Sequence, residues 1–131
     1  MTTIAFIMQQ TMIFSVPLLV VAMGGMYSER SGVINVGLDG GMIMGAFTGT
    51  LFINQMQGNM SGQGLLLLAM LVAGLSGFLF TIFHAFASIN LKANQVISGT
   101  AMNMFAPAFA IFAARLVFGT QQVQFRDTFF I

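Results

Sequence analysis

Three polar side chains in otherwise apolar sequence have the chemistry to contact a solute. Asn35 and Asp39 are four residues apart within residues 32–49, which read GVINVGLDGGMIMGAFTG, and Asn103 lies in a later apolar stretch. A carboxylate at the centre of a bilayer costs about 2.5–3.5 kcal/mol unless it faces protein or a polar path. We therefore interpret Asn35, Asp39 and Asn103 as solute-path candidates, although an asparagine in a membrane more commonly bonds a neighbouring helix.

Asp39 has a structural interpretation as well. If this stretch is one helix, Asn35 and Asp39 share a face that points nearly opposite to the face of the neighbouring glycines. If its first residues are non-helical, Asp39 becomes the N-cap of a helix that begins at Gly40, where its oxygen would accept from unpaired backbone N–H groups. Both interpretations stay open, and we favour the cap.

Glycines recur every four residues in the same stretch, at Gly37, Gly41, Gly45 and Gly49. Four residues advance an α-helix by about 400°, so these glycines form one slowly drifting stripe. Because glycine lets two helix backbones approach closely, we interpret all four as helix-packing residues. The alternative is a glycine-interrupted span that lines a transport path. If the segment is one helix, its glycine face and its face with Asn35 and Asp39 both avoid lipid, which predicts a central helix surrounded by protein.

The residue types that the chain lacks exclude several kinds of chemistry. It has no Cys and a single His, His84, so it offers no thiol nucleophile and no convincing Ser–His–Asp set. No His, Asp or Glu cluster has metal-ligand spacing, and no glycine-rich phosphate loop is present. We expect neither an enzyme nor a metal site, and we interpret His84 as a hydrogen-bonded or solvated side chain. If ATP drives transport, another chain must hydrolyse it.

The composition indicates a membrane protein. Of the 131 residues 57% are hydrophobic and 5% are charged, whereas soluble domains carry about 25% charged residues. Since open sheets cannot span lipid, the expected fold class is all-α integral membrane and polytopic, with about four transmembrane helices. Each predicted span is long enough to cross a hydrocarbon core of about 30 Å. The spans are residues 4–26, 33–53, 65–89 and 96–118.

The positions of the basic residues orient the predicted spans. Arg30 and Lys92 fall in the first and third connections, which lie on the same side of the membrane. The positive-inside rule places these connections in the cytoplasm and the N-terminus outside. The net charge is +1 and there is no basic run, so nucleic-acid binding has no electrostatic footprint.

Two stretches resemble a known family. Residues 24–47, GGMYSERSGVINVGLDGGMIMGAF, and residues 93–107, ANQVISGTAMNMFAP, are similar to motifs of the permease subunits of bacterial ABC importers. The resemblance is to the simple-sugar and nucleoside branch, which is related to the ribose and branched-chain amino-acid permeases. It implies a permease component in the bacterial plasma (inner) membrane that forms part of the translocation path for a nucleoside or simple sugar.

The resemblance also implies partners. They are a second permease subunit, identical or paralogous, a cytoplasmic ATP-binding subunit and an extracytoplasmic solute-binding protein. ATP and Mg would be bound by the partner ATPase, and this chain would bind no cofactor itself.

Members of that family are considerably longer than this chain. We therefore expect residues 1–131 to be a single transmembrane region, the first half of a larger permease fold, and either an N-terminal fragment or a truncated gene product. Two other functions remain as alternatives. One is a small self-assembling four-span proton-coupled transporter, for which Asp39 is the one candidate carboxylate, and the other is a membrane assembly factor.

Overall fold

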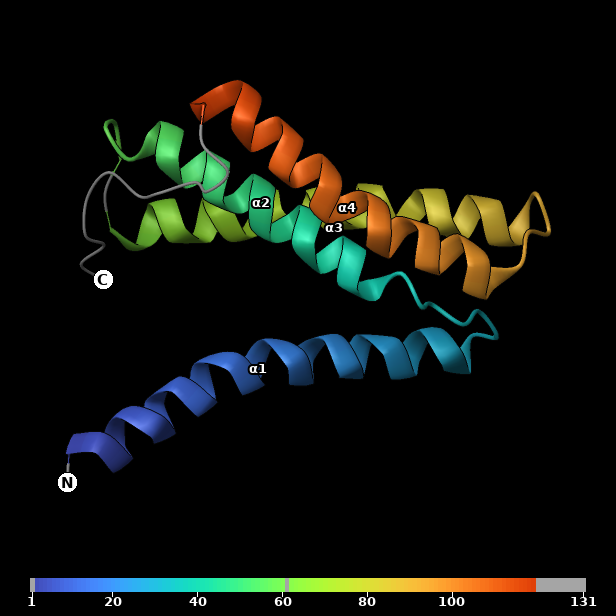
Figure 1. Ribbon diagram of the computed structural model, residues 1–131, viewed down its shortest axis with the longest axis horizontal. Coiled ribbons are helices and arrows are strands. Elements are labelled where there is room, and N and C mark those ends of the chain that lie inside the picture. The colour runs from blue at the N-terminus through green and yellow to red at the C-terminus, as the bar shows by residue number, and fades with distance from the viewer. Residues whose placement is uncertain (1, 61, 120–131) are drawn as a thin grey trace.

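The computed structural model describes residues 2–60 and 62–119, and every regular element in these residues is a helix (Figure 1). The elements are α1 (Thr2–Arg30), α2 (Leu38–Met56), α3 (Gln63–Ile89) and α4 (Gln95–Phe118). The predicted all-α fold is therefore confirmed. Residues 120–131, the last part of the predicted region 1–131, lie outside the described residues.

Three of these helices have the length and apolar composition to cross a membrane. They are α1, α3 and α4, whose apolar stretches are 28, 27 and 24 residues long, more than the roughly 20 residues that a spanning helix needs. The chain is thus a multi-pass membrane protein. The 19-residue helix α2 is not among the three, and its lower apolar content follows from Asp39, Asn54 and Gln55.

The second predicted span begins later than expected. Helix α2 starts at Leu38 rather than at Val33, and it continues to Met56. Residues 33–37 are therefore non-helical. Apolar composition does not mark this break, because Val33, Ile34 and Val36 suit a span as well as they suit an extended segment.

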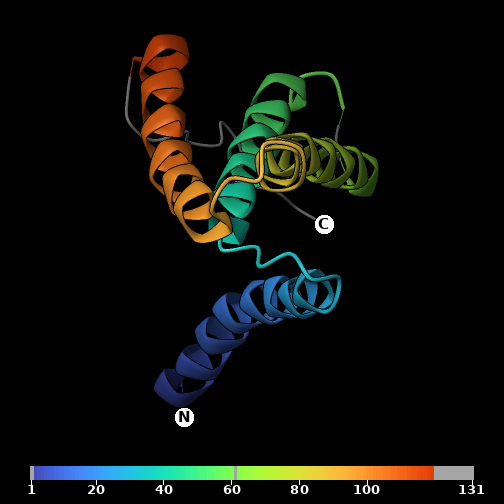
Figure 2. The ribbon, with the colours of Figure 1, turned by 90° about the vertical axis from the view of Figure 1, so that its right-hand side faces the viewer.

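The helices α2, α3 and α4 form one packed group, and α1 stands apart from it. In two perpendicular views α2 lies between α3 and α4 (Figures 1 and 2), and it contacts both of them. The apolar stretch of α1 has 0% of its residues buried. Its side chains therefore face lipid or other protein. The contacts of α2 on two sides agree with the expectation of a central helix.

Small residues on both helices bring α2 and α3 into backbone contact. A Cβ added at Gly45 would lie 2.9 Å from the carbonyl oxygen of Ala73, and one added at Gly49 would lie 3.0 Å from the Cβ of Ala73. Farther along, a Cβ at Gly77 would lie 3.1 Å from the carbonyl oxygen of Gly41. Such close approach gives the van der Waals contact that replaces hydrophobic drive in lipid. The hydroxyls of Thr48 and Ser76 hydrogen-bond across the same interface.

Glycines also bring the start of α2 against α4. A Cβ added at Gly99 would lie 2.8 Å from the amide nitrogen of Gly37, and one added at Gly40 would lie 2.9 Å from the carbonyl oxygen of Met102. Gly37 therefore packs on α4, whereas Gly41, Gly45 and Gly49 pack on α3. The single glycine stripe expected from the sequence is divided between two neighbours because α2 begins only at Leu38.

We predict that Gly45→Ala destabilises the protein by about 1–3 kcal/mol, because the new methyl group meets the backbone of Ala73 and overpacks the interface. Gly74→Ala is the matched control, since no heavy atom lies within 4 Å of a Cβ at that position. Thermal unfolding of the full-length protein in detergent should show a lower midpoint for Gly45→Ala and an unchanged or higher midpoint for Gly74→Ala. Equal midpoints for the two variants would contradict the close packing of α2 on α3.

Candidate functional site

The predicted site residues meet where the chain enters α2. After α1 ends at Arg30, the chain turns at Gly32, whose φ of 85° is readily adopted by glycine. Residues 33–37 then run beside the first turns of α4, so that Ile34 is bonded to Gln95 and Gly40 to Asn103. With a rise of 1.5 Å per residue, Asn103 lies about 12 Å along α4 from its start. The helix α2 therefore begins well inside the packed group rather than at its end.

Side chains of α3 and α4 hold both polar groups of the Ile34 backbone. The Oε1 atom of Gln95 accepts from the Ile34 amide at 2.8 Å, and Nε2 of His84 lies 3.4 Å from the Ile34 carbonyl oxygen. Because a carbonyl oxygen only accepts, Nε2 must be the donor, and in a neutral imidazole Nδ1 then accepts from the Ser98 hydroxyl at 3.2 Å. His84 is 1% exposed. It is thus buried and hydrogen-bonded, in agreement with that interpretation from the sequence.

Asn103 caps α2 from the neighbouring helix. Its Oδ1 accepts from the Gly40 amide at 2.8 Å, and its Nδ2 donates to the Val36 carbonyl at 2.7 Å. The N-cap residue of α2 is Gly37, which has no side chain to bond the first amides of the helix. Asn103 therefore satisfies one of the amides that a helix leaves unpaired at its N-terminus.

The interpretation of Asp39 as the N-cap is wrong. The cap position is Gly37, no side chain of α2 itself forms a cap bond, and Asp39 lies exposed in the first turn. Two residues before Asp39, the backbone of Gly37 packs against Gly99, where an added Cβ would lie 2.8 Å from the Gly37 amide nitrogen, and the helix begins directly after this contact. Among the described residues the carboxylate of Asp39 has no hydrogen-bond or ion-pair partner. It still complements the positive end of the helix macrodipole.

Asn35 occupies a turn and not a helix face. Its Oδ1 accepts from the amide of Gly37 at 3.1 Å, which is the local bond that asparagine forms in turns. The face shared by Asn35 and Asp39 in a continuous helix is therefore absent, because Asn35 precedes α2. The structure nonetheless brings Asn35, Asp39 and Asn103 to the same place, the N-terminus of α2.

Sequence reasoning missed Gln95 and Ser98 and gave no specific role to His84. Gln95, Gly99 and Asn103 are spaced by four residues, which places them on one face of α4. That spacing was a usable signal for a face that contacts a polar neighbour. Nothing in the spacing showed that the neighbour would be the backbone of residues 34–40.

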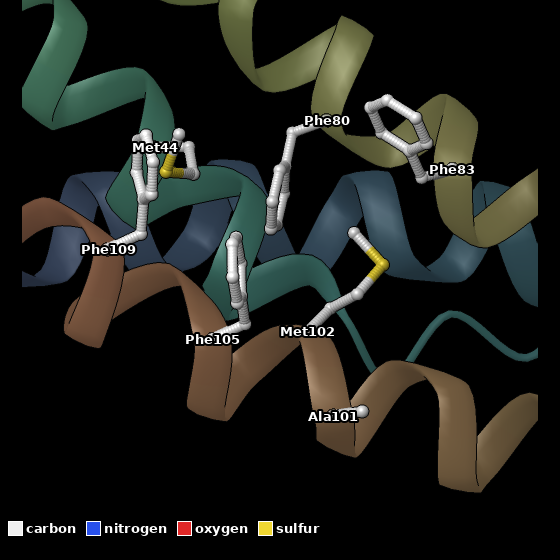
Figure 3. A pocket seen from close by; sticks show the side chains of 7 residues that line it. All are labelled: Met44, Phe80, Phe83, Ala101, Met102, Phe105 and Phe109. Atoms are coloured by element: carbon white, nitrogen blue, oxygen red, sulfur yellow. The ribbon is translucent and has the colours of Figure 1, made fainter.

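An apolar pocket of about 650 Å³ lies between α2, α3 and α4 (Figure 3). Stacked rings form much of its wall, with centroids 6.3 Å apart for Phe80 and Phe105 and 5.7 Å apart for Phe105 and Phe109. The other lining residues are Met44, Phe83, Ala101 and Met102. These side chains offer no hydrogen bond to a polar solute. The polar entry to α2, and not this pocket, is the candidate functional site.

No group of three or more His, Cys, Asp or Glu residues in the described ranges has the arrangement of a metal site. The candidate site is therefore built from amides, one carboxylate and backbone groups. Such groups can bind a solute through hydrogen bonds.

The family model described as "Branched-chain amino acid transport system / permease component" matches residues 7–131. The chain belongs to this permease family. The resemblance inferred from residues 24–47 and 93–107 is thereby confirmed. No solved structure matches the chain significantly.

Three curated relatives are similar to this chain over most of its length. The guanosine ABC transporter permease protein NupQ of Bacillus subtilis is 42% identical over 119 residues, which cover 91% of this chain and 37% of the relative. The nucleoside ABC transporter permease protein NupC of Lactococcus lactis is 37% identical over 125 residues, which cover 95% of this chain and 39% of the relative. A putative glucose ABC transporter permease protein of Haloferax volcanii is 35% identical over 108 residues, which cover 82% of this chain and 29% of the relative. The chain thus spans less than two fifths of the length of these relatives.

We predict that Gln95→Leu accelerates amide hydrogen exchange at Ile34, because the amide loses its acceptor. A typical hydrogen bond contributes about 1 kcal/mol, which corresponds to roughly a fivefold change in the local opening equilibrium. Gln95→Glu is the matched control, since its carboxylate keeps the acceptor at the N-terminus of α4. Exchange measured by mass spectrometry on peptides covering residues 33–37 should rise in Gln95→Leu alone. A similar rise in both variants would show that the side-chain acceptor does not hold this segment.

Proposed function

We propose that this permease component forms part of the solute translocation path of an ATP-driven ABC importer for nucleosides or simple sugars. The observation that carries the proposal is the family match over residues 7–131. Relatives named for guanosine and for nucleosides favour a nucleoside, and the relative named for glucose keeps simple sugars in the same class.

The geometry at the start of α2 supports a place on the path. Transporters bind solutes at discontinuous helices, where irregular backbone lines a cavity inside the protein. Here residues 33–37 are irregular, and α2 begins about 12 Å along α4 at the usual helical rise. Asp39 is exposed in the first turn of α2. Its carboxylate accepts from hydroxyl groups, which nucleosides and simple sugars share.

The partners and the location in the cell belong to the same proposal. A cytoplasmic ATP-binding subunit would bind ATP and Mg, an extracytoplasmic solute-binding protein would deliver the solute, and a second permease subunit would complete the path. The bacterial inner membrane with the N-terminus outside is supported by Arg30 and Lys92, because the end of α1 and the α3–α4 connection lie at the same end of the molecule (Figure 1).

We predict saturable, ATP-dependent uptake of radiolabelled guanosine by proteoliposomes that contain the full-length protein with its ATPase and binding protein. Excess unlabelled nucleoside should compete, and an ATPase variant unable to hydrolyse ATP should abolish uptake. A proton ionophore should leave uptake unchanged, because the proposed importer draws its energy from ATP.

The controls separate the possible outcomes of this uptake experiment. Labelled glucose and ribose tested in parallel identify a sugar importer if guanosine fails. Uptake that collapses with the ionophore and does not require ATP would contradict the proposal and support a proton-coupled transporter.

A further inference from the structure

The amide of Asn103 is engaged on both sides of the start of α2. Its Oδ1 accepts from the amide of Gly40, inside the first turn, and its Nδ2 donates to the carbonyl of Val36, before the helix begins. Two short bonds to backbone fix both the position and the plane of a side-chain amide. Asn103 is thus already committed to this chain's own backbone at the place where solute contact is expected.

The same two bonds determine where the first turn of α2 lies against α4. The backbones meet at Gly40, where an added Cβ would lie 2.9 Å from the carbonyl oxygen of Met102, so the turn cannot move closer to α4. The bonds from Asn103 prevent it from sliding along α4 or moving away. No side chain of α2 itself bonds the cap. The position of this turn therefore depends on Asn103.

Asp39 moves with this turn. Successive residues of a helix are 100° apart, so Asp39 points about 100° from Gly40, which faces α4, and about 160° from Gly41, which faces α3. Its carboxylate is consequently directed away from α3, and its side chain is exposed. A rotation of the first turn therefore changes the direction of this carboxylate.

We infer that Asn103 is a positioning residue, which holds the first turn of α2 and thereby places Asp39, and that Asn103 is not itself a contact for the solute. The consequence of this inference for transport rests on the proposed function. The placement of Asp39 by Asn103 can be measured without any transport.

Thiol labelling at position 39 tests the placement. The chain has no Cys, so Asp39→Cys introduces a single thiol into it, and the protein that retains Asp39 gives the background. In membranes containing the full-length protein, adding Asn103→Ala should accelerate labelling by a water-soluble maleimide by up to about thirtyfold, the factor expected from losing two typical hydrogen bonds of about 1 kcal/mol each. The matched control is Thr100→Val, because Thr100 is exposed on α4 and, among the described residues, its hydroxyl bonds only to the carbonyl of Val96 in the same helix.

Asn103→Asp provides a milder variant. It keeps the acceptor for the Gly40 amide and loses the donor to Val36, so it should give a smaller acceleration and serves if Asn103→Ala does not assemble. An unchanged rate in Asn103→Ala, or in Asn103→Asp where only that variant assembles, would overturn the inference. Equal acceleration by Thr100→Val would overturn it too.

Uptake by a double variant tests the consequence for transport. If Asn103 acts through Asp39, Asn103→Ala should lower uptake in the unaltered protein and have little further effect in an Asp39→Asn background. Independent solute contacts would instead give additive losses, and additive losses would overturn the positioning role. Absence of nucleoside and sugar uptake by the unaltered protein would contradict the proposed function alone, because the labelling result does not depend on transport.

Discussion

The polar groups of an irregular backbone segment must all be bonded when the segment lies among membrane helices. Each unpaired group away from water costs several kcal/mol, so such a segment persists only where the surrounding protein supplies partners. For residues 33–37, side chains that belong to other helices supply several of these partners. Gln95 and His84 bond the two polar groups of Ile34, and Asn103 bonds Val36 and Gly40. The location of α2, and with it the packing of α3 and α4, follows from this constraint.

Glycine makes these bonds geometrically possible. A side-chain amide as short as that of asparagine reaches a neighbouring backbone only where two backbones nearly touch, and Gly37, Gly40 and Gly99 provide that approach. On the other side of α2, Gly41 and Gly45 allow α3 to come equally close. By composition α2 is the helix least suited to span a membrane, and it is also the helix with the most protein around it. The glycines of α2 meet protein on both sides, whereas Asp39 and Gln55 are exposed.

Much of the fold could be predicted from the sequence, whereas the site could be predicted only in part. Long apolar runs indicated all four helices, since only helices satisfy their own backbone in lipid. The span boundary at Val33 was wrong because Val33, Ile34 and Val36 are as apolar as a spanning helix, whereas the interpretation with a non-helical start and a helix from Gly40 came within two residues of the observed start at Leu38. The cap was assigned to Asp39 from a local rule, and that rule failed because the cap comes from Asn103, 63 residues from the amide it bonds. Contacts between residues so distant in sequence leave no local pattern. The solute-path role of Asn35 and Asp39 stays a prediction, and for Asn103 we propose the positioning role in its place.

The non-helical segment before α2 also sets how many residues the chain must contain between two bonded positions, Ile34 and Gly40. From Ile34 to Gly40 the chain advances six residues, and the partners Gln95 and Asn103 are eight residues apart on α4. A continuous helix of six residues would rise about 9 Å, short of the roughly 12 Å between the partners, whereas extended residues rise about 3.3 Å each and make up the difference. A deletion or insertion here would shift every later bond out of register. The turn at Ser31 and Gly32 lies outside this measured length, so variation in the number of residues is expected there and not between Ile34 and Gly40.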